Sequence, residues 1–311
     1  TTSIKEALTL LNEAHCDGVI GLGGGSVLDT AKAVAISRTN TGDLVAYAGL
    51  SKIKQAPLHV IAIPTTAGTG SEVSYWSVFT DSASGLKIGV GGYQVFPRIA
   101  IGDPDLTISL PPKLTASTGM DALTHAIESY TNNSYQPISD ILALKAMELI
   151  GKYLRPAVTN GQDSEARYGM LLGSMLAGIA MNPTRLGIAH ALAMPLGSWD
   201  LKIPHGVANG ILLPHVMQFN LVANLERFAD VAKALGECTQ GLSKRTAADR
   251  SVTAVKELLE DIGFCEGLGS YGLTESRISD IVAEAMKSGN IAVNTRQATA
   301  SDVQAICLSA L

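Results

Sequence analysis

The sequence predicts a two-part fold, with an α/β unit in residues 1–107 and an all-helical unit in residues 108–311. Up to Pro104, segments of helical apolar spacing alternate with short β-branched runs, a pattern typical of a largely parallel sheet packed with helices. Beyond Pro104, almost every apolar segment has a helical period. The 311 residues, 46% of them hydrophobic, are enough to bury the cores of two domains.

The α/β unit is predicted to contain two helices and four strands. Apolar residues recur every three or four positions in residues 4–13 and again in residues 26–36, which indicates two helices. The clearest strand is a β-branched run that Pro64 ends, because proline cannot donate to a sheet. The predicted strands cover residues 19–22, 58–63, 73–80 and 98–102.

The helical unit is predicted to begin at Pro111 and Pro112, since proline is tolerated in the first turn of a helix. Thr299 and Asp302 have the spacing of a capping box, which marks the start of a last helix. The other predicted helices cover residues 138–153, 166–181, 221–235, 247–262 and 273–287. The longest near-apolar stretch, residues 169–181, is shorter than the roughly 20 residues that span a bilayer, so we expect a buried helix.

Charge and cysteine content narrow the functional classes. The net charge is −5 and the chain has no run of Lys or Arg, which argues against a nucleic-acid partner. The four cysteines are far apart and form no CxxC pair, which argues against a structural zinc site and a disulfide framework. With no signal-peptide pattern at its start, the chain is expected to be a cytoplasmic protein that does not associate with membranes.

Two loops are predicted to bind a dinucleotide. Residues 23–26, Gly-Gly-Gly-Ser, follow a strand and open a helix, whose free N–H groups attract phosphate. Residues 64–72, Pro-Thr-Thr-Ala-Gly-Thr-Gly-Ser-Glu, follow another strand and offer small hydroxyl side chains. Two such loops meet at the carboxyl edge of a parallel sheet, where nucleotides bind. The glycine loop taken alone is equally consistent with a plain tight turn.

A second set of residues has the chemistry of a metal site. Asp121 and His125 are four residues apart, so on a helix they lie on the same face. His190 and His205 follow, and three of the six histidines of the chain are therefore in this set. One carboxylate with three imidazoles suits Fe²⁺ or Zn²⁺. Pattern alone leaves the alternative that each histidine is an ordinary core or surface residue.

Four ordered motifs resemble those of the iron-containing alcohol dehydrogenase family. Residues 23–32 resemble its GGGSxxDxxK fingerprint, and residues 64–72 resemble its PTTxGTGSE loop. Residues 119–128, Gly-Met-Asp-Ala-Leu-Thr-His-Ala-Ile-Glu, are similar to its first metal motif. Residues 187–197, together with 204–209, resemble the second metal motif. The likeness extends from about residue 16 to the end of the chain.

The resemblance implies a Rossmann-like N-terminal domain followed by an all-helical C-terminal domain. It implies an enzyme that transfers hydride between a small alcohol or aldehyde and NAD or NADP, usually as a homodimer or a larger homo-oligomer. The metal, Fe²⁺ or Zn²⁺, is expected on Asp121, His125, His190 and His205. The residues implied to lie near the cofactor are Gly24, Gly25, Ser26, Asp29, Thr65, Thr66, Thr69 and Lys87.

Two departures from the family's pattern bear on function. Met194 occupies the position, four residues after His190, where many members have a second histidine, and methionine cannot relay a proton. Members of the family also have an α/β segment that precedes the part matching this chain, and an acidic residue in that segment reads the adenosine ribose. The residues at hand therefore leave both NAD and NADP open as the cofactor. Without that segment the parallel sheet is expected to have an unpaired edge.

Other functions remain as alternatives at this point. One is a metal-dependent polyol or polyol-phosphate dehydrogenase, or a dehydroquinate-synthase-like lyase, of the same architecture. A phosphate substrate needs cationic side chains, and Arg185 and Lys202 are the nearest to the metal motifs in sequence. A non-catalytic dinucleotide-binding module is the alternative from another class.

Overall fold

Two small sheets form the framework of the N-terminal part. The computed structural model describes residues 1–197 and 201–311. Its parallel sheet has the strand order β1-β3-β6 and contains β1 (Gly18–Gly23), β3 (His59–Pro64) and β6 (Ile99–Ala100). The register pairs Gly23 with Pro64, so the loops that follow β1 and β3 start side by side. The edge strand β1 has only β3 as a neighbour among the described residues.

The second sheet differs from the prediction. It has the order β2-β5-β4 and contains β2 (Gly49–Leu50), β5 (Lys87–Gly91) and β4 (Trp76–Thr80). Strand β4 is antiparallel to β5, so the prediction of a largely parallel sheet is wrong for this part of the chain. The strand predicted from residue 73 starts only at Trp76, because Ser71–Val73 form a 3-10 turn, η2. Strands β2 and β5 are too short and too rich in glycine for a sequence pattern to reveal them.

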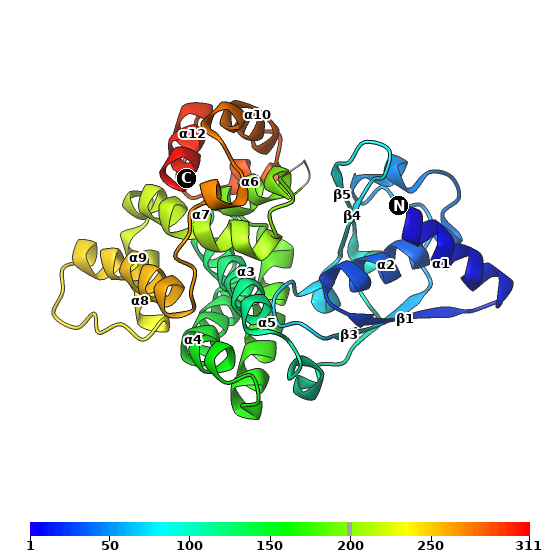
Figure 1. The fold of residues 1–311 in the computed structure, drawn as a ribbon, viewed down its shortest axis with the longest axis horizontal. Coiled ribbons are helices and arrows are strands. Elements are labelled where there is room, and N and C mark those ends of the chain that lie inside the picture. The colour runs from blue at the N-terminus through cyan, green and yellow to red at the C-terminus, as the bar shows by residue number, and fades with distance from the viewer. Residues whose placement is uncertain (198–200) are drawn as a thin grey trace.

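Helices α1 (Thr2–Glu13) and α2 (Gly25–Thr39) complete the N-terminal part, as predicted. Helix α2 packs against strands of both sheets, and α1 packs against α2 (Figure 1). Ala31 and Ala35 of α2 are buried against Val60 of β3. Because these side chains are small, α2 packs close to the parallel sheet.

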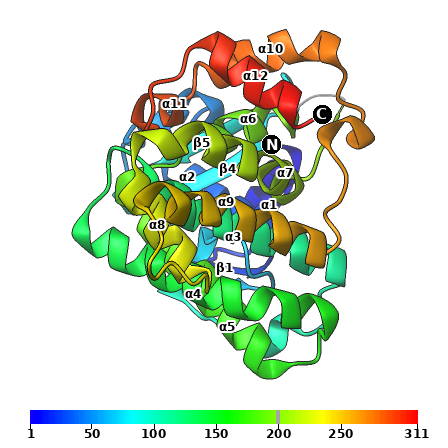
Figure 2. The same ribbon diagram turned by 90° about the vertical axis from the view of Figure 1, so that its left-hand side faces the viewer.

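The C-terminal part is helical. Its helices are α3 (Pro112–Thr131), α4 (Pro137–Thr159), α5 (Ser164–Thr184), α6 (Ile188–Leu196), α7 (His205–Asn220), α8 (Leu225–Ala234), α9 (Lys244–Asp261), α10 (Glu275–Ala285), α11 (Gly289–Val293) and α12 (Ala300–Ser309). Helix α3 is buried along most of its length, since α4, α5 and α7 all pack against it (Figure 2). Among residues 1–197 and 201–311, no helix combines the length and the apolar character that a membrane crossing requires.

The predicted helices are present, including the capping box that Thr299 and Asp302 form at the start of α12. The helix predicted over residues 221–235 is interrupted, because the Asn224 side chain accepts a hydrogen bond from the Arg227 N–H and caps α8. Helices α6 and α7 escaped prediction. Most of their residues are buried on every side, so they lack the alternation of polar and apolar faces that reveals an amphipathic helix.

Candidate active site

A carboxylate and two imidazoles meet in the interior of the helical part. Asp121 lies on α3, His190 on α6, and His205 is the first residue of α7. One ligand atom from each of these residues lies within 4.8 Å of the others. Asp121 Oδ1 is 3.7 Å from His190 Nε2 and 3.8 Å from His205 Nε2. Three helices that are distant in sequence therefore supply one compact donor set.

His125, the fourth predicted ligand, lies beside this set. Its ring is stacked on that of His190, with 4.6 Å between the centroids. His125 is not within the 4.8 Å group that Asp121, His190 and His205 form. Its Nδ1 is buried and has no hydrogen-bond partner in the structure.

The donor set fits a divalent cation. Besides Nδ1 of His125, Nε2 of His190 and Nδ1 of His205 are buried without a hydrogen-bond partner. Leaving a buried polar atom unpaired costs about 1–3 kcal/mol. Of these atoms, Nε2 of His190 also lies 3.7 Å from the buried Asp121 carboxylate, and an orphaned nitrogen in that place is expected of a residue that binds an ion.

Burial and charge set the protonation of the three imidazoles. Burial lowers the pKa of His125 to about 4 and that of His205 to about 3, so both rings are neutral at neutral pH. Burial alone would also lower the pKa of His190, but Asp121 and Glu128 outweigh it and raise this pKa to about 9. Burial would raise the pKa of Asp121, yet the surrounding histidines hold it well below its usual value.

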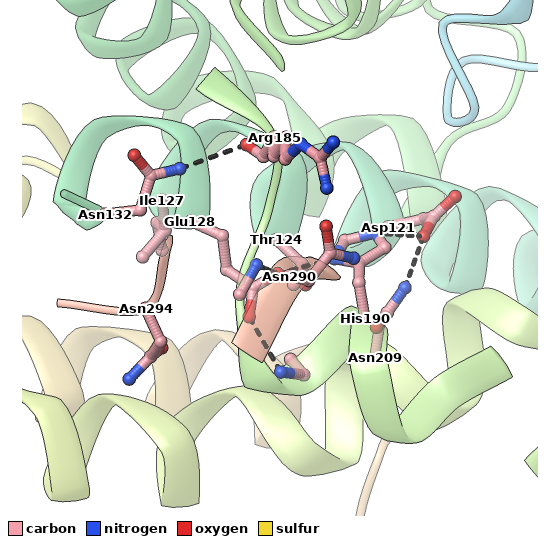
Figure 3. A network of polar contacts seen from close by, with 12 residues as sticks. Asp121, Thr124, Ile127, Glu128, Asn132, Arg185, His190, Asn209, Asn290 and Asn294 are labelled. Carbon is pink, nitrogen blue, oxygen red and sulfur yellow. Dashed lines mark hydrogen bonds and ion pairs between the residues drawn. The ribbon is translucent and has the colours of Figure 1, made fainter. Parts of the chain in front are cut away.

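Two residues of this centre were missed by the sequence analysis as functional residues. Asn209 Nδ2 donates to Asp121 Oδ1 over 2.7 Å, and Glu128 Oε2 lies 2.7 Å from His190 Nδ1 (Figure 3). A signal for both exists in the sequence. Glu128 is seven residues after Asp121 and so on the same face of α3, while Asn209 is one turn after His205 on α7.

The two predicted cofactor loops lie against each other. The Thr65 N–H donates to Gly23 O over 3.0 Å. A Cβ atom built on Gly25 would lie only 2.5 Å from Thr69 Cγ2, and one on Gly24 would lie 3.3 Å from Thr66 Cγ2. Glycine at these positions therefore allows the loops to touch, and the exposed Ser26 is left in the first turn of α2.

Asp29 ties α2 to the second loop. Its Oδ1 accepts a hydrogen bond from Ser71 Oγ at 2.6 Å and lies 3.4 Å from Lys32 Nζ. Lys32 is fully buried and also donates to Trp76 O. The Asp29 side chain thus has partners inside the protein, with only 15% of it exposed.

Lys87, the first residue of β5, lies within electrostatic reach of both the first cofactor loop's helix and the donor set. Burial lowers the pKa of its ammonium group, while Asp121 and Asp29 oppose that shift. The two carboxylates that influence it belong to the two halves of the site. Lys87 Nζ also lies 3.0 Å from the position that a Cβ on Gly197 would occupy.

The second loop is fixed onto α5 by a close backbone contact. A Cβ built on Gly70 would lie 2.6 Å from Gly178 Cα, so neither position has room for a side chain. Asn182 extends this contact, since its Nδ2 donates to Val73 O and the Tyr75 hydroxyl donates to Asn182 O. The N-terminal part is thereby attached to the helical part beside the cofactor loops.

Glu72, in the second loop, is expected to make the free energy of unfolding depend on pH. Its side chain is buried, and Oε1 has no hydrogen-bond partner. Burial raises its pKa from 4.5 to about 7. The folded protein therefore holds a proton that the unfolded chain releases, and this stabilisation is lost as the pH rises from about 4.5 through 7. The full difference is about 3 kcal/mol, from the size of the shift.

We expect the Glu72→Gln variant to lack this pH-dependent part of the free energy of unfolding. Urea unfolding of both proteins between pH 5 and 8.5 would measure that part, as the difference in free energy between wild type and variant at each pH. The free energy of unfolding of the wild type should fall relative to the variant over that range, because only the wild type carries the titrating carboxyl. Parallel profiles for the two proteins would contradict the assignment.

Comparisons with known proteins agree with this architecture. The model of the family described as "Iron-containing alcohol dehydrogenase" matches residues 1–104, and that of "Fe-containing alcohol dehydrogenase family, C-terminal" matches residues 115–311. The 1,3-propanediol dehydrogenase of Citrobacter freundii is 40% identical over 306 residues, which cover 98% of this chain and 79% of that protein. The NAD-dependent methanol dehydrogenase of Bacillus methanolicus is 39% identical over 310 residues, covering 100% of this chain and 81% of that protein.

A solved structure extends the agreement to three dimensions. The crystal structure of a 1,3-propanediol oxidoreductase superimposes with a TM-score of 0.97 at 39% sequence identity. The alignment covers 100% of this chain and 81% of that one. The Rossmann-like and all-helical fold implied by the sequence resemblance is therefore confirmed, and so is the resemblance itself. The chain belongs to the iron-containing alcohol dehydrogenase family, and it is an oxidoreductase that acts on alcohols.

Proposed function

We propose that this enzyme transfers hydride between a small primary or secondary alcohol, or its carbonyl product, and NAD or NADP at a divalent metal centre. The observation that carries the proposal is Asp121 beside three adjacent imidazoles, each of which has one buried ring nitrogen without a hydrogen-bond partner in the protein. When bound, Fe²⁺ or Zn²⁺ would supply Lewis acidity to the substrate oxygen and the nicotinamide would supply the redox chemistry.

In this proposal the metal ligands are Asp121, His125, His190 and His205. The low pKa values of His125 and His205 favour neutral rings, which is the form that binds metal. Asp121 is a ligand and not a base, since its pKa lies well below the usual value and Asn209 fixes its Oδ1. The carboxylate also offsets part of the charge of a divalent ion.

The cofactor is proposed to lie across the two loops that follow β1 and β3. The N-terminus of α2, which begins at Gly25, offers unpaired N–H groups for the pyrophosphate. The ammonium group of Lys87 lies where it is influenced by both Asp29 and Asp121, which supports a place beside the cofactor. The residues proposed to approach the cofactor are Gly24, Gly25, Ser26, Asp29, Thr65, Thr66, Thr69 and Lys87. The name of the Bacillus methanolicus relative, an NAD-dependent enzyme, supports NAD.

Two features support a small alcohol as the substrate. The names of two relatives specify 1,3-propanediol and methanol, both small primary alcohols. Met194 lies one turn after His190 on α6 and offers an apolar side chain near the metal centre. We propose that it forms part of the substrate wall.

The two parts of the chain are proposed to divide the binding of cofactor and metal between them. Residues 1–107 would form the cofactor-binding domain and residues 108–311 the metal-binding domain. We propose a homodimer or larger homo-oligomer in the cytoplasm, with small molecules as its other partners and neither nucleic acid nor membrane among them. Three exposed free cysteines, Cys16, Cys238 and Cys265, support a reducing compartment, and the net charge of −5 supports the absence of nucleic acid.

The test is metal analysis of anaerobically purified protein, combined with an NAD(P)-linked assay of small alcohols with and without a chelator. We expect about one Fe or Zn per chain and turnover that the chelator abolishes, because the donor set is the only source of Lewis acidity proposed. Readdition of Fe²⁺ or Zn²⁺ should restore the activity. Turnover that survives complete removal of metal would contradict the proposal.

A further inference from the structure

Glu128 is a buried carboxylate that no ligand role explains. It lies on α3, is 4% exposed and faces the start of α6. Its Oε2 accepts hydrogen bonds from the Gly187 N–H at 2.8 Å and lies 2.7 Å from His190 Nδ1, while Oε1 accepts from the Ala189 N–H at 2.7 Å. Three donors from one short stretch of chain therefore converge on a single side chain.

The surroundings are shaped for this carboxylate. A Cβ built on Gly187 would lie 2.8 Å from Glu128 Oε1, so only glycine leaves room for the side chain. Gly187 is the N-cap of α6 and provides no side-chain cap, so Glu128 performs the capping from another helix. Asn132, the residue that follows α3, donates from Nδ2 to the carbonyl groups of Thr184 and Arg185, which precede this cap. The turn between α5 and α6 is thus held by Glu128 and by the residue at the end of the same helix.

The contact with His190 has a chemical consequence. A carboxylate has only acceptor oxygens, so the hydrogen between Glu128 Oε2 and His190 Nδ1 must belong to the imidazole. When the ring gives up its second hydrogen to bind a metal, the lone pair is on Nε2, the atom that lies 3.7 Å from Asp121 Oδ1 and has no hydrogen-bond partner. Glu128 thereby selects the tautomer in which His190 can bind a metal through Nε2.

We propose that Glu128 is a positioning residue of the metal centre, which fixes both the place and the tautomer of His190. This inference rests on the proposed function, because it assumes that His190 is a ligand. Glu128 does not touch the reacting atoms in this scheme. It acts on the metal through His190, as carboxylates that accept from ligating imidazoles do in other metal sites.

The Glu128→Gln variant is the sharpest probe because it preserves the size of the side chain. An amide places a donor NH₂ where one carboxylate oxygen stood, and all three neighbours are donors. If the NH₂ faces His190, it favours the tautomer with hydrogen on Nε2, which cannot bind metal. If it faces the Ala189 N–H, two donors oppose each other and the start of α6 is displaced.

The experiment is titration of the metal-free protein with Co²⁺, followed by its d–d absorption spectrum and by the dissociation constant. The wild type is expected to bind about one Co²⁺ per chain. The Glu128→Gln variant should bind it about 10- to 100-fold more weakly, with an altered spectrum. Glu148→Gln is the matched control, because Glu148 is an exposed residue of α4 paired with Lys145, and it should bind as the wild type does. The Glu128→Asp variant keeps the charge and should recover part of the affinity.

The outcomes separate this inference from the proposed function. If the wild type binds no Co²⁺, or if His190→Ala binds it as the wild type does, the metal site itself is wrong. If the wild type and His190→Ala behave as expected but Glu128→Gln keeps the wild-type constant and spectrum, only the positioning role fails. Lower thermal stability of the Glu128→Gln variant with unchanged Co²⁺ binding would reduce Glu128 to a helix cap and overturn the inference.

A measurement on the wild type covers the case in which the variant does not fold. Protein labelled with ¹⁵N in histidine and loaded with Zn²⁺ reports which ring nitrogen carries hydrogen. His190, identified by comparison with a His190→Gln sample, is expected to carry hydrogen on Nδ1 and to bind Zn²⁺ through Nε2. Coordination through Nδ1 would contradict the inference.

Discussion

Replacing His205 with alanine is expected to lower kcat/KM for alcohol oxidation by about 1000-fold or more, while leaving the protein folded. The expected loss corresponds to the several kcal/mol of charge stabilisation that a catalytic metal supplies. His205 is the first residue of α7 and its side chain is 28% exposed, so water can enter the space that its removal leaves. The measurements are metal content per chain, steady-state kinetics and thermal unfolding.

His215 provides the matched control for that variant. It lies on the same helix ten residues after His205, which places it about 15 Å further along the helix axis. The His215→Ala variant should keep its metal and its turnover. Wild-type turnover with a full complement of metal in the His205→Ala variant would show that this imidazole is not a ligand.

The Gly206→Ala variant is expected to disturb the metal centre as strongly as His205→Ala does, because the added methyl group collides with a neighbouring helix. A Cβ at this position would lie 2.1 Å from Ser117 O, a backbone atom of α3, and 3.4 Å from Asp121 Cβ. Backbone cannot move aside as a side chain does, so α3 and α7 must separate and carry Asp121 and His205 apart. We expect a loss of about 1–3 kcal/mol of folding free energy and a large drop in metal content.

Gly210, one turn further along α7, is the matched control. A Cβ there would have side-chain atoms of Met120 and Phe264 as its nearest neighbours, at 3.2 Å. Alanine also has the higher helix propensity, by about 1 kcal/mol, so the Gly210→Ala variant should change stability little. Urea unfolding and metal analysis of the Gly206→Ala and Gly210→Ala variants would test this difference in stability and metal content. Equal behaviour of the two variants would mean that the close approach of α3 and α7 does not support the metal centre.

The architecture could be predicted from the sequence wherever a single periodicity determined an element. The helices with one apolar face, such as α4 and α9, and the strand that Pro64 ends were found in this way. The second sheet could not be predicted, because the pairing of β4 with β5 depends on contacts between short strands that have no periodic signal of their own. Helices α6 and α7 carry metal-motif residues, but burial on every side removes the pattern that would have revealed them.

The three side chains that the structure brings together, Asp121, His190 and His205, could be proposed from the sequence, but the side chains that support them could not. Pattern alone left each histidine as a possible core or surface residue, and the resemblance to the family's metal motifs singled out the set. The roles of Glu128 and Asn209 depend on which side chains face them across a helix interface. A sequence reports the face on which a residue lies, but it does not report what packs against that face.

The capping of α6 by Glu128 also bears on how the protein folds. Gly187 and Glu128 are 59 residues apart in sequence, and α6 has only nine residues. A helix of this length is unstable on its own, and its first turn lacks a local cap. We therefore expect the turn that presents His190 to become ordered only after α3 has formed and the chain has closed a long loop. The metal centre is then expected to form late in folding.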